Sequence, residues 1–529
     1  MTEETADERV RVAEVVGALC LATDLAMGFP FEHGFRSTLV AMRLADRLGV
    51  DDETATRTYY VCLLSYAGCT ADAEIDAELF GGSMTEHFAP VMFGSPRELL
   101  GGLARALPDP GRSPPVRAAQ LVRRLPRAAR HGAPHLAALC EVAEMLTGRL
   151  GLPQSIAAQF ALLTERWDGK SRLGRARGDE IPLPLRITHV ARDATFQRLI
   201  GGVEQAGRVV ASRAGHAFDP HVATLLADEA PTLLAADPAP SAWDALLAAE
   251  PGHRVVLEGA AVDRALAAVG DFADLVSPSF IGHAAGVAAL AGDAATRMGL
   301  ADRDVTAVRR AGLVHDVGRV AVPTGIWQKP GPLDADDWEK VRLHPYHTER
   351  VLAPSPFLAR LTATAGAHHE RLDGSGYHRG ATARELGVPA RLLAAADAYH
   401  AMTEPRTHRD ALSPEVAAET LLGECSAGLL DPDAVAAVLD AAGRPVRRID
   451  RPGGLTERET EVVALIARGL QTKQVARLLG ISPKTADHHI QNAYAKIGVS
   501  SRAAAALFAM EHGLVALGEL PMVTPARRS

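Results

Sequence analysis

Apolar residues recur at intervals of three and four positions along almost the whole chain, whereas runs that alternate with a period of two are rare. The first spacing places apolar side chains on one face of a helix, and the second is typical of strands. Proline and glycine interrupt the helical pattern at residues 107–115 and 443–454, where we expect loops or linkers. The pattern therefore predicts an all-α protein.

The helical pattern also occurs twice. His33 opens one predicted helix and His283 opens another, and the residues that follow them match at the same spacing of 250. Further along, residues 165–169 match residues 370–374 at a spacing of 205, so the first copy carries about 45 extra residues between the two blocks. An ordered series of matches is hard to obtain by chance, and it indicates two tandem copies of one helical domain.

The length of 529 residues is too great for a single hydrophobic core. Together with the repeat, it predicts four parts of the chain. These are a first helical copy at residues 1–230, a second copy at 231–443, a linker at 444–454 and a C-terminal module at 455–529.

The composition, with 47% apolar and 23% charged residues, is that of an ordinary globular protein. The five cysteines show no paired spacing, and the chain has neither a signal-peptide pattern nor an apolar run long enough to span a membrane. We therefore expect a cytoplasmic protein that does not contact a membrane. The net charge of −8 excludes a chain that binds polyanions over its whole surface. A local basic stretch before the C-terminal module could contact phosphate or could equally be a solvated linker; it contains Arg444, Arg447, Arg448 and Arg451.

Residues of metal-ligand type are concentrated in the second copy, where nine of the twenty histidines fall between His283 and His408. A single buried histidine is more often a core residue than a ligand. Here, however, several ligand-type residues stand at successive helix ends, and one aspartate lies within an apolar stretch, where a charge is costly unless it is paired or metal-bound. The pattern favours a metal site made of His283, His315, Asp316, His344, His368, His369 and Asp397.

In this order and spacing, residues 265–443 resemble the HD-GYP branch of the HD phosphohydrolases, most specifically in the loop at 368–377. The resemblance implies one metal held by His283, His315, Asp316 and Asp397. Asp316 would bridge to a second metal held by His344, His368 and His369. Iron, manganese and zinc all suit such mixed ligands. Two metals about 3.5–4 Å apart can stabilise an in-line displacement at phosphorus, and the family's usual substrate is the phosphodiester cyclic di-GMP.

The resemblance also implies roles for individual side chains near the metals. It assigns catalysis to Asp316 and Arg319 and substrate contacts to Arg319, Gly376, Tyr377 and Arg409. Arg319 replaces the family's lysine and offers a planar fork of donors rather than a point charge.

The chain departs from the family pattern at three further positions. His378 stands in place of the proline of the GYP triplet, and His400 stands where an aspartate often follows the second aspartate ligand. Members with a third metal carry a glutamate four residues before the first histidine, and here that position is Ser279, which favours two metals.

The repeat spacings show which residues of the first copy correspond to the ligands. Ser65-Tyr66 stand at the positions of His315-Asp316, Leu163-Thr164 at those of His368-His369, and Arg192 at that of Asp397. His33 alone is retained. Without a bridging carboxylate no dinuclear site can form, so we expect this copy to be a scaffold that packs against the other copy or a sensor.

The C-terminal module shows the signals of four helices. Thr456 and Glu459 form a capping box at the start of the first helix, a second follows at 472–479, Ser482 caps a third with proline in its first turn, and the last runs over 502–512. Two short helices joined by a glycine-bearing turn predict a helix-turn-helix.

Residues 455–509 resemble the LuxR-type DNA-binding domain, whose third helix enters the major groove of double-stranded DNA. The resemblance places the apolar stretch 503–507 on a dimer surface, so we expect a homodimer. A helical bundle used only for protein contacts is the alternative. The residues expected to face DNA are Lys484, Thr485, Asp487, His488 and Gln491, and those expected to contact phosphate are Lys473, Arg477 and Lys496.

Three hypotheses for the function follow. The first is a transcription regulator whose DNA binding responds to a phosphoester at the second copy. The second is an active phosphodiesterase that the DNA-binding module localises. The third is a dimerising scaffold with a retired metal site.

Overall fold

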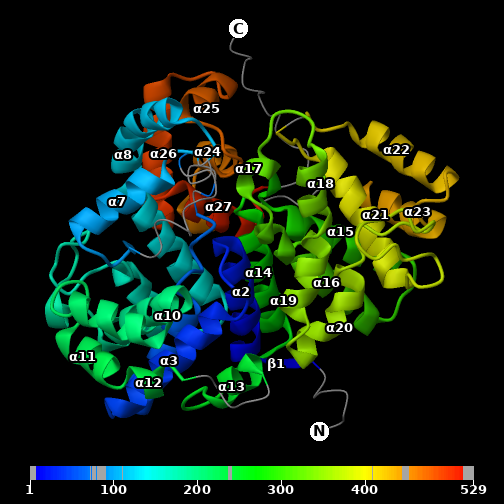
Figure 1. The fold of residues 1–529 in the computed structure, drawn as a ribbon. Helices are drawn as coiled ribbons and strands as arrows, with labels where there is room; N and C mark the ends of the chain where they lie inside the picture. The colour runs from blue at the N-terminus through cyan, green and yellow to red at the C-terminus, as the bar shows by residue number, and fades with distance from the viewer. Residues whose placement is uncertain are drawn as a thin grey trace. The chain divides into compact units, whose positions relative to one another are not determined.

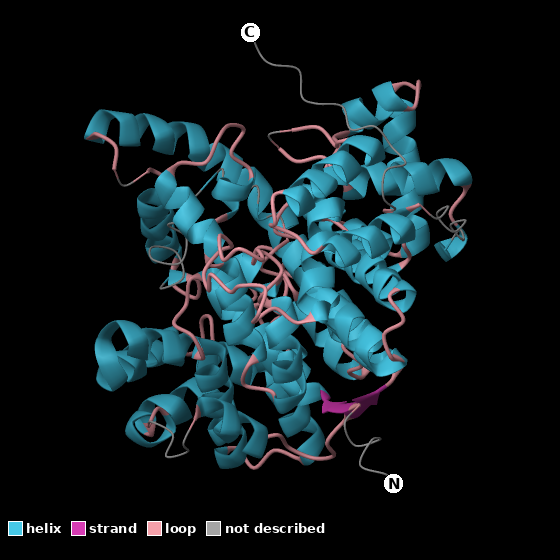
Figure 2. Ribbon diagram, turned by 90° about the vertical axis from the view of Figure 1, so that its right-hand side faces the viewer, coloured by secondary structure: helices cyan, strands magenta, loops and turns pink. Residues whose placement is uncertain are grey.

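The computed structural model describes residues 8–71, 73, 79, 91–109, 111–235, 241–407, 409–443 and 452–515. Within these ranges the chain is almost entirely helical, and its named strands are one short antiparallel pair, β1 (Arg9–Arg11) and β2 (Val256–Glu258) (Figure 2). The prediction of an all-α protein is confirmed. The basic stretch from Arg444 to Arg451 lies outside the described residues. No helix in the described ranges has the length and apolar character needed to cross a membrane.

The chain divides into two compact units, residues 1–262 and 263–529. The first unit contains ten α-helices among its described residues (Figure 1). They are α2 (Val12–Met27), α3 (His33–Arg47), α4 (Asp52–Leu63), α7 (Pro96–Ala106), α8 (Pro114–Arg149), α9 (Gln154–Ala157), α10 (Leu183–Arg213), α11 (Pro220–Asp228), α12 (Ala230–Leu233) and α13 (Ala242–Ala248).

The second unit begins within α14 (Ala260–Asp274) and holds both the second helical copy and the C-terminal module. Its second copy continues with α15 (His283–Arg297), α16 (Asp302–Val314), the short 3-10 helix η5 (Val317–Ala321), α17 (Thr324–Trp327), α18 (Ala335–Arg342), α19 (His344–Leu352), α20 (Pro356–Ala365), α21 (Val388–Thr403), α22 (Pro414–Ser426) and α23 (Pro432–Ala442).

Equivalent contacts occur at matching positions of the two proposed copies. Near the start of each copy a buried aspartate accepts a hydrogen bond from a backbone N–H in the first turn of the next helix: Asp24 from Gly34 (3.0 Å) and Asp274 from Ala284 (2.9 Å). Both aspartates and both donors are 250 residues apart. Later in each copy an arginine pairs with the aspartate that caps a helix, Arg186 with Asp219 (2.7 Å) and Arg391 with Asp431 (2.8 Å). The two copies therefore share both pattern and contacts.

The first unit extends beyond residue 230, where the sequence placed the end of the first copy. Trp243 on α13 packs against Phe35 on α3, with ring centroids 5.8 Å apart, and β2 pairs with β1. Glu250 pairs with Arg11 and accepts a hydrogen bond from the Tyr60 hydroxyl at 2.6 Å. These buried contacts hold residues 241–262 to the first helices of the chain.

The C-terminal module forms the four predicted helices, α24 (Glu457–Ala467), α25 (Thr472–Leu478), α26 (Pro483–Ile497) and α27 (Arg502–Glu511). The Thr456 hydroxyl accepts from the Glu459 N–H, and the Glu459 carboxylate accepts from the Thr456 N–H, which is the predicted capping box. Apolar side chains of α24, α25 and α26, including Val462, Val475 and Ile490, form the core of the module.

Candidate metal centre

Helix ends bring the ligand-type residues of the second copy together. His283 is the first residue of α15 and follows Gly282, whose positive φ of 85° allows the chain to turn into the helix. His315 and Asp316 lie between α16 and η5, and His344 opens α19. The two remaining histidines follow α20, and the second aspartate is buried in the middle of α21. Two groups result, one of His283, His315, Asp316 and Asp397 and one of His344, His368 and His369.

The first group combines two imidazoles with two carboxylates. His283 Nε2 lies 3.1 Å from Asp397 Oδ1 and 3.4 Å from Asp316 Oδ2, and His315 Nε2 lies 3.1 Å from the same Asp316 oxygen. All four side chains are almost completely buried. A divalent cation bound among these atoms would offset the charge of both carboxylates.

The second group is joined to the first through the other oxygen of Asp316. Asp316 Oδ1 lies 3.1 Å from His344 Nε2 and 3.4 Å from His368 Nε2, and these two nitrogens are 3.0 Å apart. Asp316 therefore presents one carboxylate oxygen to each histidine group. This is the arrangement that a bridging ligand between two metals requires.

Three of the histidines are oriented by the chain itself. The Nδ1 atoms of His315, His344 and His368 each lie 2.6–2.8 Å from the carbonyl oxygen three residues earlier. In the neutral ring, a hydrogen on Nδ1 leaves the lone pair on Nε2. The local backbone thus directs Nε2 of each ring toward Asp316.

Buried polar atoms without hydrogen bonds suit a metal site. His315 Nε2 and both oxygens of Asp316 are buried and make no hydrogen bond of normal geometry, although His315 and Arg319 lie within ion-pair distance of Asp316. Such atoms are costly unless an ion or water satisfies them. Burial lowers the pKa of His368 to about 4. For His315, burial alone would lower the pKa, but Asp316 and Asp397 raise it to about 9, so a metal at this nitrogen would displace a proton. For Asp316, burial alone would raise the pKa, but Arg319 and His315 hold it well below its usual value. A neutral imidazole and an ionised carboxylate are the forms that bind metals.

Arg319 is a buried cation beside the bridging carboxylate. Its guanidinium pairs with Asp316 and stacks on the ring of Phe280, 3.9 Å from the ring centroid. The ring of Trp327 lies 5.6 Å away, and the indole N–H donates to the Arg319 carbonyl at 3.3 Å. The two aromatic rings hold the guanidinium at the metal groups, where it can bind a phosphate oxygen.

The loop after His369 is packed by a buried glutamate. Glu370 accepts hydrogen bonds from the backbone N–H groups of Arg379 (3.1 Å) and Ala381 (2.9 Å). A Cβ atom at Gly376 would lie 2.5 Å from the Cα of Glu370, so the loop needs glycine there. The ring of Tyr377 then stacks on His369 at a centroid distance of 4.4 Å. His369 remains 22% exposed, so the second group reaches solvent at this residue.

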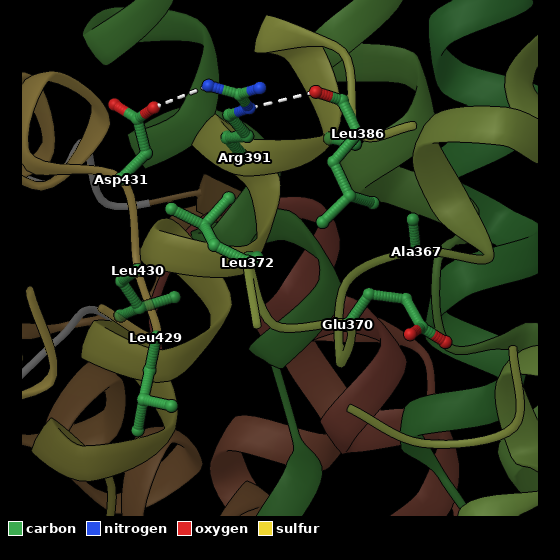
Figure 3. A pocket seen from close by; sticks show the side chains of 10 residues that line it. Ala367, Glu370, Leu372, Leu386, Arg391, Leu429, Leu430 and Asp431 are labelled. Atoms are coloured by element: carbon green, nitrogen blue, oxygen red, sulfur yellow. Dashed lines mark hydrogen bonds and ion pairs between the residues drawn. The ribbon is translucent and has the colours of Figure 1, made fainter. Parts of the chain in front are cut away.

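A small pocket beside this loop is lined by Arg391 and Asp431, which form an ion pair with a structural role. In Figure 3 the guanidinium of Arg391 lies between the carboxylate of Asp431 and the carbonyl of Leu386, both at 2.8 Å. The first unit has the equivalent pair, Arg186 with Asp219, although its metal ligands are missing. The ion pair therefore belongs to the repeated fold and not to the metal chemistry.

Arg409, which the sequence assigned to substrate contact, has backbone partners in the structure. Its guanidinium donates to the carbonyl oxygens of Ala401 and Met402 at the end of α21 and to those of Glu404 and Asp410. These bonds satisfy carbonyl groups that the helix end leaves free. The structure thus gives Arg409 a capping role.

Sequence reasoning missed Glu404. Its Oε2 lies 2.9 Å from His283 Nδ1, and His400 is adjacent, so that His283, His400 and Glu404 form a third group of ligand type. The signal was present, because Asp397, His400 and Glu404 follow one another at spacings of three and four, which places them on one face of a helix.

In the first unit the equivalent positions hold no ligand set. The ring of Tyr66 stands at the position of Asp316, and the guanidinium of Arg192 lies over it. His33 is buried, and its Nε2 has no hydrogen-bond partner. A phenol ring and a guanidinium therefore occupy the positions that carboxylates hold in the second copy.

The C-terminal module exposes most of the side chains predicted to face DNA. On α26 these are Lys484, Thr485, Asp487, His488 and Gln491, and on α25 they are Lys473 and Arg477. Lys496 differs, because its ammonium pairs with the buried Glu459 at 2.6 Å. Burial alone would raise the pKa of Glu459, but Lys496 and Thr456 lower it to about 2. The stretch 503–507, expected on a dimer surface, is buried within the chain.

Two protein families match separate parts of the chain. Residues 268–433 match the HD domain, and residues 454–509 match the bacterial regulatory proteins of the luxR family. The second unit therefore contains an HD domain followed by a LuxR-type helix-turn-helix domain, and both predicted resemblances are confirmed.

Several characterised proteins are similar to the chain. The 3'3'-cGAMP-specific phosphodiesterase 3 of Vibrio cholerae is 28% identical over 437 residues, which are 81% of this chain and 94% of that protein. This alignment is longer than the second unit and so extends into the first. The cyclic di-GMP phosphodiesterase response regulator RpfG of Xanthomonas campestris pv. campestris is 32% identical over 152 residues, which are 28% of this chain and 40% of that protein.

A solved structure supports the fold. The crystal structure of a cyclic GMP-AMP specific phosphodiesterase of Vibrio cholerae, V-cGAP3, superposes with a TM-score of 0.58 at 24% identity, covering 83% of this chain and 99% of that one. The chain therefore shares its fold with this protein.

Proposed function

We propose that this chain, which joins an HD domain to a LuxR-type helix-turn-helix domain, is a cytoplasmic DNA-binding transcription regulator whose HD domain binds two divalent metals and a cyclic dinucleotide. The observation that carries the proposal is the position of Asp316, whose two carboxylate oxygens face separate histidine groups. The similarity to cyclic-dinucleotide phosphodiesterases supports the ligand class.

The chain's own residues suggest how the site would work. His283, His315 and Asp397 would hold one metal, His344, His368 and His369 would hold the other, and Asp316 would bridge them. When bound, the metal pair supplies Lewis acidity at a phosphodiester. Arg319 would bind a non-bridging phosphate oxygen through its planar fork of donors. Tyr377 and Gly376 lie in the loop beside His369, the partly exposed ligand of the second group, where a nucleotide could approach.

Helix α26 supports the proposed binding to DNA. Its exposed polar side chains form the face that enters the major groove in helix-turn-helix domains, and Lys473 and Arg477 on α25 are free to contact phosphate. We propose a homodimer on DNA, as paired half-sites require. Because residues 503–507 are buried in the single chain, dimerisation would use another surface or would expose α27.

The first test is elemental analysis of the purified chain beside Asp316→Asn, with Asp302→Asn as the control because Asp302 is exposed at the start of α16. We expect about two metals per wild-type and control chain and fewer than one in Asp316→Asn. A wild-type chain without metal would overturn the proposal.

The second test concerns ligand and DNA together. Calorimetry with cyclic di-GMP and with 3'3'-cGAMP should show binding that Asp316→Asn loses, and chromatography of the products separates binding from hydrolysis. DNA affinity at fixed salt should then change when the bound dinucleotide is added. An unchanged DNA affinity would leave a phosphodiesterase that its DNA-binding domain only localises.

A further inference from the structure

The two ring nitrogens of His283 face different surroundings. Nε2 lies 3.1 Å from Asp397 Oδ1, within the first ligand group, whereas Nδ1 lies 2.9 Å from Oε2 of Glu404. The other three histidines whose Nε2 faces a carboxylate of the groups use a backbone carbonyl on the Nδ1 side. On the Nδ1 side of His283 the nearby groups are instead side chains, the Glu404 carboxylate and, at 3.2 Å, Nδ1 of His400.

Glu404 is held by two further donors. His400 Nδ1 lies 3.4 Å from Oε2 of Glu404, and Arg406 Nη2 lies 3.1 Å from the same oxygen. Arg406 is fixed in turn, because it donates to the Ser279 carbonyl at 3.0 Å and lies 4.7 Å from the centroid of the Phe280 ring. The carboxylate of Glu404 is therefore kept ionised and oriented beside His283.

These side chains could in principle hold a third cation, but the geometry argues against it. A histidine binds metal through one nitrogen while the other carries a hydrogen, so a second metal on His283 would require removal of that hydrogen. The guanidinium of Arg406 already supplies a positive charge to the Glu404 oxygen that a cation would need. Ser279, at the position where a glutamate would favour a third metal, offers only its carbonyl to Arg406.

We infer that Glu404 is a positioning residue that accepts the Nδ1–H of His283 and so fixes the tautomer that offers Nε2 to the first metal. This inference rests on the proposed metal centre. Carboxylates that orient a ligating histidine raise its basicity, and their loss lowers metal affinity by about 10- to 100-fold.

Glu404→Ala and Glu404→Gln in the full chain test the inference, with Glu419→Gln as the control because Glu419 is an exposed carboxylate on α22. The probe is Zn²⁺, measured by elemental analysis for stoichiometry and by competition with a chelator for affinity. Thermal unfolding of the metal-free proteins separates folding defects from binding defects.

We expect two zinc ions per wild-type chain, with one bound about 10- to 100-fold more weakly in Glu404→Ala. Glu404→Gln keeps an oxygen that accepts the Nδ1–H, so its loss of affinity should be smaller, and Glu419→Gln should match the wild type. The metal-free variants should melt close to the wild type.

Three results would overturn the inference. Equal zinc affinity in Glu404→Ala and wild type would show that Glu404 does not act on His283. Three ions in the wild type and two in Glu404→Ala would assign Glu404 to a third metal site. A wild-type chain that binds no zinc, iron or manganese would instead remove the proposed function on which the inference stands.

Discussion

The guanidinium of Arg192 lies 4.1 Å from the centroid of the Tyr66 ring in the first unit. By the repeat spacings these residues occupy the positions of Asp397 and Asp316 in the second copy. A permanent cation and a phenol thus stand where the other copy has its two carboxylates. Because the guanidinium is always protonated and has no acceptor atom, it cannot bind a metal and repels one nearby.

This relationship predicts different outcomes for the two histidines that open equivalent helices. His283→Ala should lower the number of metals per chain, since His283 lies within the carboxylate group. His33→Ala, at the equivalent position of the first copy, should leave the metal content at the wild-type value. Elemental analysis of both variants checks this, and a loss of metal in His33→Ala would show that the first copy binds an ion.

The free energy of unfolding should depend on pH through the protonation of His33. Burial, reinforced by the charges of Arg192 and Arg36, lowers its pKa to about 4. The unfolded chain therefore binds a proton that the folded chain does not between about pH 6.5 and pH 4. Stability is greatest above this window and falls through it as pH decreases, by up to about 1.4 kcal/mol per pH unit for one such histidine.

His33→Phe should remove that dependence while keeping aromatic packing against Phe29, whose ring centroid lies 4.6 Å from that of His33. Urea unfolding of wild type and variant at a series of pH values from 7.5 to about 4.5 measures the difference. We expect the free energy of unfolding of the variant to fall less steeply with decreasing pH. Parallel profiles would mean that His33 titrates normally in the folded chain.

Two glycines of α15 differ in how much space a larger side chain would have. A Cβ atom at Gly286 would lie 1.8 Å from His400 Nε2, whereas one at Gly292 would meet Arg309 Cβ at an ordinary 3.4 Å. Gly286→Ala should displace His400 and weaken zinc binding by about tenfold through the loss of support for Glu404. Gly292→Ala in the same helix should keep wild-type affinity. Chelator competition compares the two, and equal affinities would show that His400 is not needed.

The two lysines predicted to contact DNA phosphate should differ. Lys473 is exposed on α25, so Lys473→Ala should weaken binding to all sequences and reduce the slope of log affinity against log salt by about 1. Lys496 is paired with the buried Glu459, so Lys496→Ala should mainly lower the stability of the module. Fluorescence anisotropy over a salt series measures both slopes. A reduction in slope for Lys496→Ala equal to that for Lys473→Ala would show that the ion pair opens on DNA.

Local sequence features predicted the starts of the helices in the C-terminal module. Thr456 with Glu459 and Ser482 with the following proline marked the starts of α24 and α26, and the structure begins both helices there. Caps and turns are contacts within a few residues, so the sequence encodes them directly. The same holds for His283 and His344, which the pattern placed at helix starts.

The end of the first unit could not be predicted from local features of the sequence. Nothing near Trp243 or Glu250 in the sequence indicates that they pack on Phe35 and Arg11, because those partners lie more than 200 residues away. The pairing of Lys496 with Glu459, 37 residues apart, and the capping role of Arg409 were also missed, although their partners lie nearer along the chain. Each depends on which of several polar partners the folded chain brings within reach.

The sequence by itself determined that the chain is helical and that a helix-turn-helix domain follows an HD domain, and it predicted that the helical domain occurs twice with metal ligands in one copy. Periodicity, spacing and capping residues carry that information along the chain. The tertiary structure alone decided that Asp316 faces both histidine groups and that Glu404 lies against Nδ1 of His283. The ring orientation of His283 depends on a residue 121 positions away, and only packing of the helices places the two side by side.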